Sequence, residues 1–193
     1  MKIKLFFVLI ILSLSMLYAQ EVIGVRKVVM VIAHENFRDE EFFEPKEILV
    51  NAGVVVKVAS SSLDMAKGVM GKSVKPDILV KDIDPLEFDA VAFIGGGGSS
   101  QYWDDPVAHK LAQNMEKRNK IVAAICIAPV TLAKAGLLKG KKATVWSSES
   151  AQLKEAGAVY TGNSVEKDGL IITAAGPFAA KQFGEEILKA LNR

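Results

Sequence analysis

The chain has 193 residues, of which 50% are hydrophobic and 24% are charged, and its formal net charge is +2. A nearly balanced charge without a basic run gives no electrostatic reason to expect nucleic acid as a partner, so we expect none. The one cysteine cannot form an internal disulfide, and the fold must therefore be held by its hydrophobic core.

The first residues have the pattern of a secretory signal. Met1–Lys4 is basic, Leu5–Leu17 is an apolar run of 13 residues, and Ser15–Ala19 offers a cleavage end. Such a run is shorter than the ~20 residues that span a bilayer. We therefore expect residues 1–19 to be a cleaved signal peptide, the protein to be exported to the periplasm or the extracellular space, and no stable membrane span to remain. The alternative is an uncleaved signal that tethers the chain to a membrane.

Cleavage of this segment would also neutralise the chain. It removes two of the 24 basic residues and none of the 22 acidic ones, which leaves 22 of each. In an oxidising compartment a lone thiol is open to oxidation, which is unusual unless the sulfur is buried or used.

After a short linker at residues 20–26, apolar runs alternate with amphipathic segments. The apolar runs predict strands at 27–33, 54–59, 89–94, 121–124, 143–146 and 170–173, with short strands and a hairpin within 67–81. The amphipathic segments predict helices at 39–51, 106–118, 129–135, 149–156 and 178–191. Continuous apolar strands separated by helices are typical of a parallel sheet covered on both faces. The pattern predicts one α/β domain over residues 27–193, a three-layer sandwich with a mostly parallel central sheet.

Sites in such sheets form beyond the carboxyl ends of the strands, and the single cysteine lies at one of these ends. Cys126 follows the strand at 121–124 and precedes a helix that begins at Pro129. Small residues, Ala124 and Ala128, flank it at two positions on either side, which is the steric arrangement of a nucleophile elbow. The helix start would favour the thiolate over the thiol. The alternative is a buried cysteine that acts only as a small hydrophobic residue.

The strand at 89–94 ends in four glycines, Gly95–Gly98, followed by Ser99 and Ser100. A phosphate-binding loop would need Gly-Lys-Ser/Thr, and a dinucleotide-binding turn would need a small third residue where Ser100 stands. We therefore expect no nucleotide cofactor here, and we expect no metal. Glycines do let backbone N–H groups approach a reacting atom, as an oxyanion hole requires. The alternative is a flexible tight turn.

Two side chains near the end of the first strand, Glu41 and His34, could move protons. Glu41 lies on the first turn of the helix at 39–51, where burial beside Cys126 would raise its pKa and keep it protonated. The alternative is a solvated acid at a helix start, the part that Asp39 and Glu40 are expected to play. His34, at the tip of the first strand, could act as a base or could simply cap the strand. The other histidine, His109, is expected on a helix surface.

Together these segments resemble the ThiJ/PfpI superfamily. The matching pieces are Phe37–Glu41 with Pro45, Asp89–Gly96, Ala123–Pro129, Val165–Thr173 and Gly176-Pro177. The resemblance spans residues 27–193 and implies a flavodoxin-like α/β sandwich that usually forms a homodimer. It also implies that Cys126 is the nucleophile, Glu41 its protonated partner and Gly96, with the Ile127 amide, the oxyanion hole. Gly95, His34 and Trp146 are possible auxiliary residues.

The sequence departs from this family at one position of chemical importance. Many active members have a histidine directly after the cysteine or on the strand two elements later, where this chain has Ile127 and then Trp146 and Ser147. Peptide hydrolysis would lack its usual Cys–His pair, so a cysteine peptidase is disfavoured.

Two functions that use the cysteine remain, together with a third alternative that does not use it. The first is a thiol-dependent glyoxalase or deglycase that acts on small reactive carbonyl compounds: Cys126 adds to the carbonyl carbon, Gly96 and the turn amides hold the oxyanion, and Glu41 moves the proton. The second is a non-enzymatic, redox-responsive or protective protein whose Cys126 is oxidised to a sulfinic acid. The third is a binding scaffold with an inert cysteine.

Overall fold

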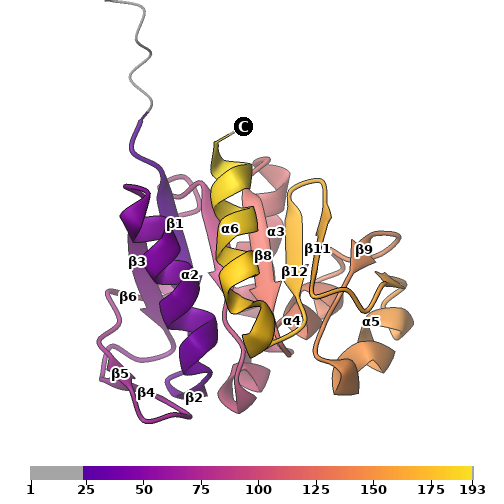
Figure 1. The fold of residues 1–193 in the computed structure, drawn as a ribbon, viewed down its shortest axis with the longest axis horizontal. Helices are drawn as coiled ribbons and strands as arrows, with labels where there is room; N and C mark the ends of the chain where they lie inside the picture. The colour runs from indigo at the N-terminus through magenta and orange to yellow at the C-terminus, as the bar shows by residue number, and fades with distance from the viewer. Residues whose placement is uncertain (1–23, 193) are drawn as a thin grey trace, which may run out of the picture.

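The computed structural model describes residues 24–192, so the expected signal peptide and most of the expected linker lie outside the described residues. Its centre is a seven-stranded sheet with the strand order β11-β12-β8-β7-β1-β3-β6 (Figure 1). All neighbouring strands pair in parallel except β11 and β12, which are antiparallel. The predicted mostly parallel sheet is therefore confirmed, and its order is that of a flavodoxin-like fold.

The bounds of the elements follow the predicted alternation closely. The strands of the main sheet are β1 (Lys27–Val31), β3 (Val55–Ser60), β6 (Ile78–Leu79), β7 (Ala90–Phe93), β8 (Ile121–Ile125), β11 (Val165–Asp168) and β12 (Ile171–Ala174). The α-helices are α2 (Asp39–Asn51), α3 (Pro106–Lys117), α4 (Pro129–Lys134), α5 (Ser150–Glu155) and α6 (Ala180–Leu191). Short 3-10 helices are η1 (Val80–Asp82), η2 (Gly97–Tyr102), η3 (Ser147–Glu149) and η4 (Pro177–Ala179). Two small sheets comprise β2 (Glu35–Phe37), β4 (Ala66–Gly68) and β5 (Ser73–Val74), and β9 (Lys142–Ala143) with β10 (Val159–Tyr160).

Helices cover both faces of the main sheet. Helices α2 and α6 pack side by side on one face, and α3 and α4 lie on the other (Figure 1). Successive side chains of a strand point to opposite faces, so Val28 and Met30 of β1 join the core beneath α2 and α6, whereas Val29 and Val31 join the core beneath α3 and α4. Both faces are buried, which explains why β1 reads as one continuous apolar run.

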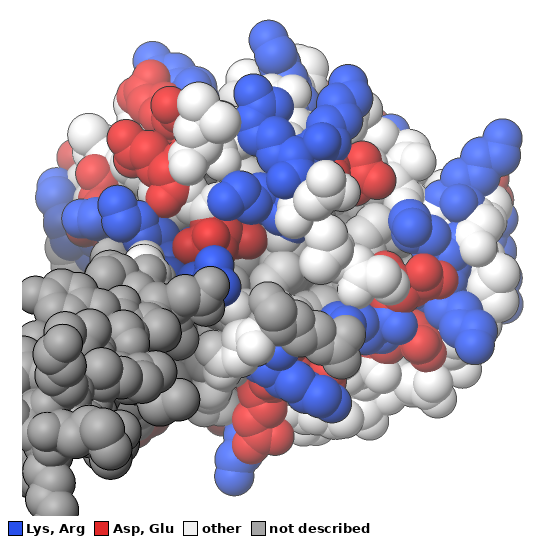
Figure 2. All heavy atoms as spheres, turned by 90° about the horizontal axis from the view of Figure 1, so that it is seen from above, with Lys and Arg blue, Asp and Glu red and all other residues white. Residues whose placement is uncertain are grey.

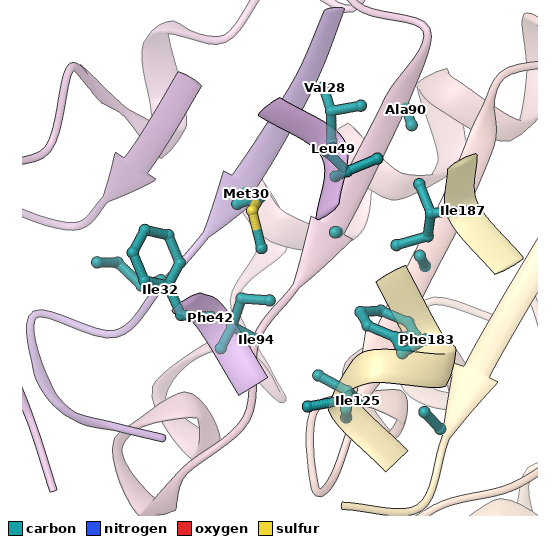
Figure 3. Close-up of a cluster of buried hydrophobic side chains, with 14 of the residues drawn as sticks. Val28, Met30, Ile32, Phe42, Leu49, Ala90, Ile94, Ile125, Phe183 and Ile187 are labelled. Atoms are coloured by element: carbon teal, nitrogen blue, oxygen red, sulfur yellow. The ribbon is translucent and has the colours of Figure 1, made fainter. Parts of the chain in front are cut away.

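The core on the α2 and α6 side is shown in Figure 3. Phe42 and Leu49 from α2 and Phe183 and Ile187 from α6 reach the sheet and are almost completely buried. The two helices approach closely at Gly184, where an added Cβ would lie 2.8 Å from the Pro45 Cα. This packing fixes the first turn of α2 against the carboxyl edge of the sheet.

Two segments differ from the sequence-based prediction. The strand predicted at 143–146 is reduced to β9, because Trp146 instead donates its backbone N–H to the Cys126 carbonyl oxygen at 2.8 Å and leaves the strand. The sequence Val165–Asp168 was not predicted as a strand, yet it forms β11, an edge strand in a hairpin with β12. Its mostly charged side chains lack the apolar alternation that marks a strand, and only pairing with β12 makes it one.

Charges on the end of the molecule that carries the C-terminus are mixed. Figure 2 shows Lys and Arg side chains interspersed with Asp and Glu over that end. Ion pairs tie some of them, since Asp89 lies 3.5 Å from both Arg26 and Lys120. Within residues 24–192, no helix has the length and apolar character needed to cross a membrane.

Candidate active site

Cys126 lies at a strained turn between β8 and α4. Its φ is +65°, in the left-handed region that non-glycine residues seldom occupy. Two backbone hydrogen bonds hold it there: the Cys126 N–H donates to the Ala174 carbonyl at 2.9 Å, and the Cys126 carbonyl accepts from Trp146. Ala124 and Ala128, on either side, are buried and leave room for the bend. The structure thus has the nucleophile elbow that the sequence predicts, with Cys126 only partly buried.

Glu41 lies opposite this turn, on the first turn of α2, and is completely buried. Gly95, at the end of β7, separates the two side chains: a Cβ added at Gly95 would lie 2.5 Å from the Cys126 Cβ and would also overlap Glu41 Oε2. Only a residue without a side chain lets the acid and the thiol meet. Neither carboxyl oxygen of Glu41 makes a hydrogen bond of good geometry, although the Cys126 thiol and the Gly95 N–H are close enough to lower its pKa.

The rest of the glycine run forms a turn of the 3-10 helix η2 and contacts the chain after β1. Gly96 has a φ of +93°, and a Cβ there would lie 2.6 Å from the Phe37 carbonyl carbon. The Gly96 carbonyl accepts from the Ser99 N–H at 3.0 Å and the Ser99 hydroxyl at 2.8 Å. The turn is therefore tied down, and the N–H groups of Gly96 and Ile127 both reach the Cys126 sulfur. These are the donors that an oxyanion hole needs.

Burial dominates the acid–base behaviour of the pair. It raises the pKa of Glu41 to about 7, with the Cys126 thiol, the Arg38 charge and the Gly95 N–H opposing it. It also raises the pKa of Cys126 to about 12; the Glu41 charge adds to this increase, and the N–H groups of Gly96 and Ile127 oppose it. The prediction that the helix start favours the thiolate is thus not met. Helix α4 has only six residues, and desolvation outweighs its dipole.

The two groups titrate as one unit, because each ionisation makes the other harder. The pair loses its first proton near pH 7 and its second only near pH 12. Between these values the pair holds a single proton, and the higher pKa of Cys126 places it on the sulfur, with Glu41 as carboxylate. The Glu41 carboxylate is then a base beside the thiol, and transfer of the proton from Cys126 to Glu41 would produce a thiolate and an acid side by side.

Cys126 and Glu41 line one pocket, which has a volume of about 380 Å³. Its other lining residues are Arg38, Val69, Gly96, Gly97, Ile127, Trp146, Ser148 and Pro177. A second hollow of about 390 Å³, between η1 and α3, is as large, but its lining has neither a cysteine nor an acid. The pocket at Cys126, which combines a cysteine with an acid, is therefore the candidate active site.

The structure separates the two histidines from this pocket. His34 is close to the Glu35 carboxylate, with Nε2 and Oε1 3.7 Å apart, and it is not among the pocket's lining residues. His109 is on α3, where its Nε2 lies 2.7 Å from the Trp103 carbonyl oxygen. The pocket has the Trp146 ring where the resemblance leads one to look for a histidine.

The expected exposure of Asp39 is wrong. It was expected to be a solvated acid at the start of α2, but it is 2% exposed, and its carboxylate accepts from the backbone N–H groups of Met70 at 2.7 Å and Lys72 at 3.0 Å. The turn between β4 and β5 covers it. Nothing in the local sequence places that hairpin beside α2, so the burial could not be predicted.

Sequence reasoning also missed four lining residues: Arg38, Val69, Ser148 and Pro177. A signal existed for Arg38, which directly precedes the helix that carries Glu41, and for Pro177, which was quoted as part of a matching piece. Val69 is on the β4–β5 hairpin and Ser148 on η3, and only the tertiary fold brings these two segments to the pocket.

Comparison with known proteins places this geometry in context. A model of the DJ-1/PfpI family matches residues 26–190. The crystal structure of a ThiJ/PfpI domain protein from Brachyspira murdochii superimposes with a TM-score of 0.85 at 35% sequence identity, covering 88% of this chain and 98% of that one.

Among relatives by sequence, an uncharacterised protein of Methanocaldococcus jannaschii is 42% identical over 86% of this chain and 83% of its own. The deglycase PfpI of Pyrococcus furiosus is 31% identical, over 85% of this chain and 99% of its own. A glutathione-independent glyoxalase of Caenorhabditis elegans is 26% identical, over 86% and 89%.

Proposed function

This chain belongs to the DJ-1/PfpI family, and on that premise we propose that it is a cysteine-dependent enzyme acting on small reactive carbonyl compounds, of the glyoxalase or deglycase type. The observation that carries the proposal is the single pocket that holds a strained cysteine, a buried acid with a pKa of about 7 and the N–H groups of Gly96 and Ile127. This set can add a thiolate to a carbonyl, hold the resulting oxyanion and move a proton.

For a 2-oxoaldehyde the proposed steps balance without an added oxidant or reductant. The Cys126 thiolate forms a C–S bond to the aldehyde carbon, and the carbonyl electron pair moves to oxygen, which takes the proton of Glu41. The Glu41 carboxylate then carries the proton of that carbon to the neighbouring carbonyl carbon, while the hydroxyl proton passes from the first oxygen to the second. The product is a thioester of a 2-hydroxy acid. Water, deprotonated by Glu41, hydrolyses the thioester and releases the acid and the Cys126 thiolate.

Peptide hydrolysis fits this pocket less well. An amide needs a protonated leaving nitrogen, which a histidine beside the nucleophile usually supplies. Of the two histidines, neither His34 nor His109 lines the pocket. Aldehydes need no such leaving group, so one acid is enough for them.

The decisive experiment follows lactate formation from methylglyoxal by the purified domain. Because methylglyoxal also reacts with lysine and arginine side chains, lactate and not the loss of methylglyoxal is the readout. We expect Cys126→Ser to lower the rate at least about 100-fold, since it removes the nucleophile. Equal rates for the two proteins, with circular dichroism showing both folded, would sink the proposal.

The redox-responsive alternative rests on the same sulfur. Cys126 is partly exposed, and a protonated Glu41 could donate a hydrogen bond to a sulfinate oxygen. Mass spectrometry after mild peroxide distinguishes the two functions. Two added oxygens on Cys126, in a protein that forms no lactate, would favour the redox-responsive role, whereas an unmodified Cys126 under conditions that oxidise a free thiol would exclude it.

We further propose that the protein is exported and forms a homodimer. Export rests on the pattern of residues 1–19, and cell fractionation with N-terminal sequencing of the mature chain tests it. The dimer is supported by exposed apolar side chains beside the pocket, namely Val69, Met70 and Phe178, of which Phe178 is 6.4 Å from the Trp146 ring. Light scattering of the purified protein measures its mass directly, and a monomer at micromolar concentration would contradict this part.

A further inference from the structure

Arg38 is the only cationic side chain among the described residues that line the pocket. The steps proposed for Cys126 and Glu41 give it no role. It is the N-cap residue of α2, and its backbone N–H donates to the Gly95 carbonyl at 3.0 Å. A Cβ on Gly96 would collide with the Arg38 backbone nitrogen. The main chain of Arg38 is therefore fixed against the two glycines of the site.

Within the described residues, only some of the N–H groups of the Arg38 guanidinium have a partner in the protein. Glu40 engages one side of it, with Oε2 at 2.9 Å from Nε and Oε1 at 3.0 Å from Nη2. In the described part of the chain Nη1 has no hydrogen-bond partner, and the side chain is 32% exposed. An arginine has five N–H donors in a planar fork, so donors remain for a second carboxylate.

The charge of Arg38 also reaches the reacting groups, since it lowers the pKa of Glu41. The guanidinium is therefore within electrostatic range of the carboxyl beside the sulfur. An anion bound to it would lie in the same pocket as the Cys126 sulfur. The rest of the lining offers no competing positive charge, and the apolar side chains Val69, Trp146 and Pro177 fill much of the remaining wall.

We propose that Arg38 is a substrate-binding residue that makes the pocket selective for reactive carbonyl compounds bearing a carboxylate, which it holds through the donors that Glu40 leaves free. This inference deepens the proposed function by naming its substrate class, and it rests on that function for turnover. Binding of the anion does not depend on turnover, so it can be tested separately.

The first test uses alkylation of Cys126, which needs no catalysis. Iodoacetate and iodoacetamide differ in one carboxylate, and mass spectrometry gives the rate of each at Cys126. We expect the ratio of the iodoacetate rate to the iodoacetamide rate at Cys126 to exceed the same ratio for a free thiol by about tenfold. This is the effect of one charge-assisted hydrogen bond in a partly exposed site. Arg38→Ala should return the ratio to the free-thiol value, and Arg38→Lys should retain part of it. Glu40→Gln should increase it, because it frees the whole guanidinium.

A matched control removes a comparable cation outside the pocket. Lys189 on α6 is paired with Glu186 at 3.2 Å, as Arg38 is with Glu40, so Lys189→Ala should leave the ratio unchanged. An unchanged ratio in Arg38→Ala would overturn the proposal. So would equal slowing of both reagents in that variant, since Arg38 would then act only through the ionisation of Glu41 and Cys126.

The second test uses turnover. 4,5-Dioxopentanoate is a 2-oxoaldehyde with a carboxylate, and its methyl ester is the uncharged counterpart. We expect the acid to have a kcat/KM about tenfold above that of the ester, and Arg38→Ala to abolish the difference through KM of the acid alone. Equal kcat/KM values for acid and ester in the unmodified protein would overturn the substrate class. If neither compound reacts, the proposed function fails, and the alkylation ratio still decides whether Arg38 binds the anion.

Discussion

Gly95 lies between the Glu41 carboxyl and the Cys126 thiol, and because it has no side chain these two groups can meet. We expect Gly95→Ala to displace Cys126 or Glu41, because the added methyl would lie 2.5 Å from the Cys126 Cβ and 2.8 Å from the Ile125 carbonyl oxygen. Overpacking of this kind costs about 1–3 kcal/mol of unfolding free energy. Lactate formation should fall at least about tenfold, since a displacement near 1 Å is enough to misalign reacting groups. Gly24→Ala is the control, because a Cβ there has no atom within 4 Å and Gly24 is not among the pocket's lining residues.

Glu41 and Cys126 share a proton, and this gives the thiol a characteristic pH dependence. The rate of alkylation of Cys126 by iodoacetamide should rise through an inflection near pH 7, where the pair loses its first proton. In Glu41→Gln no second acid is present, and the thiol should react only as the pH approaches its own, burial-raised pKa. Rates measured by mass spectrometry from pH 5 to pH 10 would show this. An inflection near pH 7 that persists in the variant would assign it to another group.

At the scale of the elements, the buried carboxylate of Asp39 joins α2 to the β4–β5 hairpin. We expect Asp39→Ala to lower the unfolding free energy by about 2 kcal/mol, because the N–H groups of Met70 and Lys72 lose their acceptor. The hairpin should loosen first, so backbone amide exchange should quicken over residues 66–74. Urea titration and hydrogen exchange measure the two effects.

The control for this prediction is Glu44→Ala, which removes an exposed acid from the same helix. Asp39→Asn should fall between the two, since it keeps one acceptor oxygen. Exchange over the hairpin that is equally slow in the alanine variant and in the unmodified protein would show that Asp39 does not hold it. Because Val69 of this hairpin lines the pocket, loosening should also lower lactate formation.

The same elements show what sequence can and cannot predict. Helix α2 was predicted with its observed bounds, since the acidic residues of its first turn and the Ala52-Gly53 ending are local signals. The elbow at Cys126 was predicted because a buried strand, small residues and Pro129 follow one another directly in the chain. By contrast, β11 owes its existence to pairing with β12, and Asp39 and Ser148 owe their surroundings to segments distant in sequence. Local signals were enough to propose Cys126 and Glu41 as candidate residues, but they could not supply the side chains that other segments bring to them.

At the scale of the whole molecule, burial of Glu41 makes folding stability depend on pH. Its pKa is about 7 in the folded protein and 4.5 as the ordinary value, so between these pH values the folded state binds more protons than the unfolded state. The contribution of Glu41 to stability therefore falls as the pH rises through this window and is greatest below it. At about 1.4 kcal/mol for each pKa unit, the loss is about 3 kcal/mol.

Comparison with Glu41→Gln isolates this contribution, because acids distant from Glu41 titrate alike in the two proteins and burial keeps the Cys126 thiol protonated in both over this pH range. The unfolding free energy, measured by urea titration at several pH values from 4 to 8, should decline about 3 kcal/mol more in the unmodified protein than in the variant. The variant should be the more stable of the two at pH 8, although it has lost the group that moves the proton. Parallel profiles would mean that the carboxyl is solvated in solution and cannot be the buried acid that the mechanism uses. The stability that the protein loses by burying Glu41 is thus a direct measure of how strongly the fold favours the protonated acid beside Cys126.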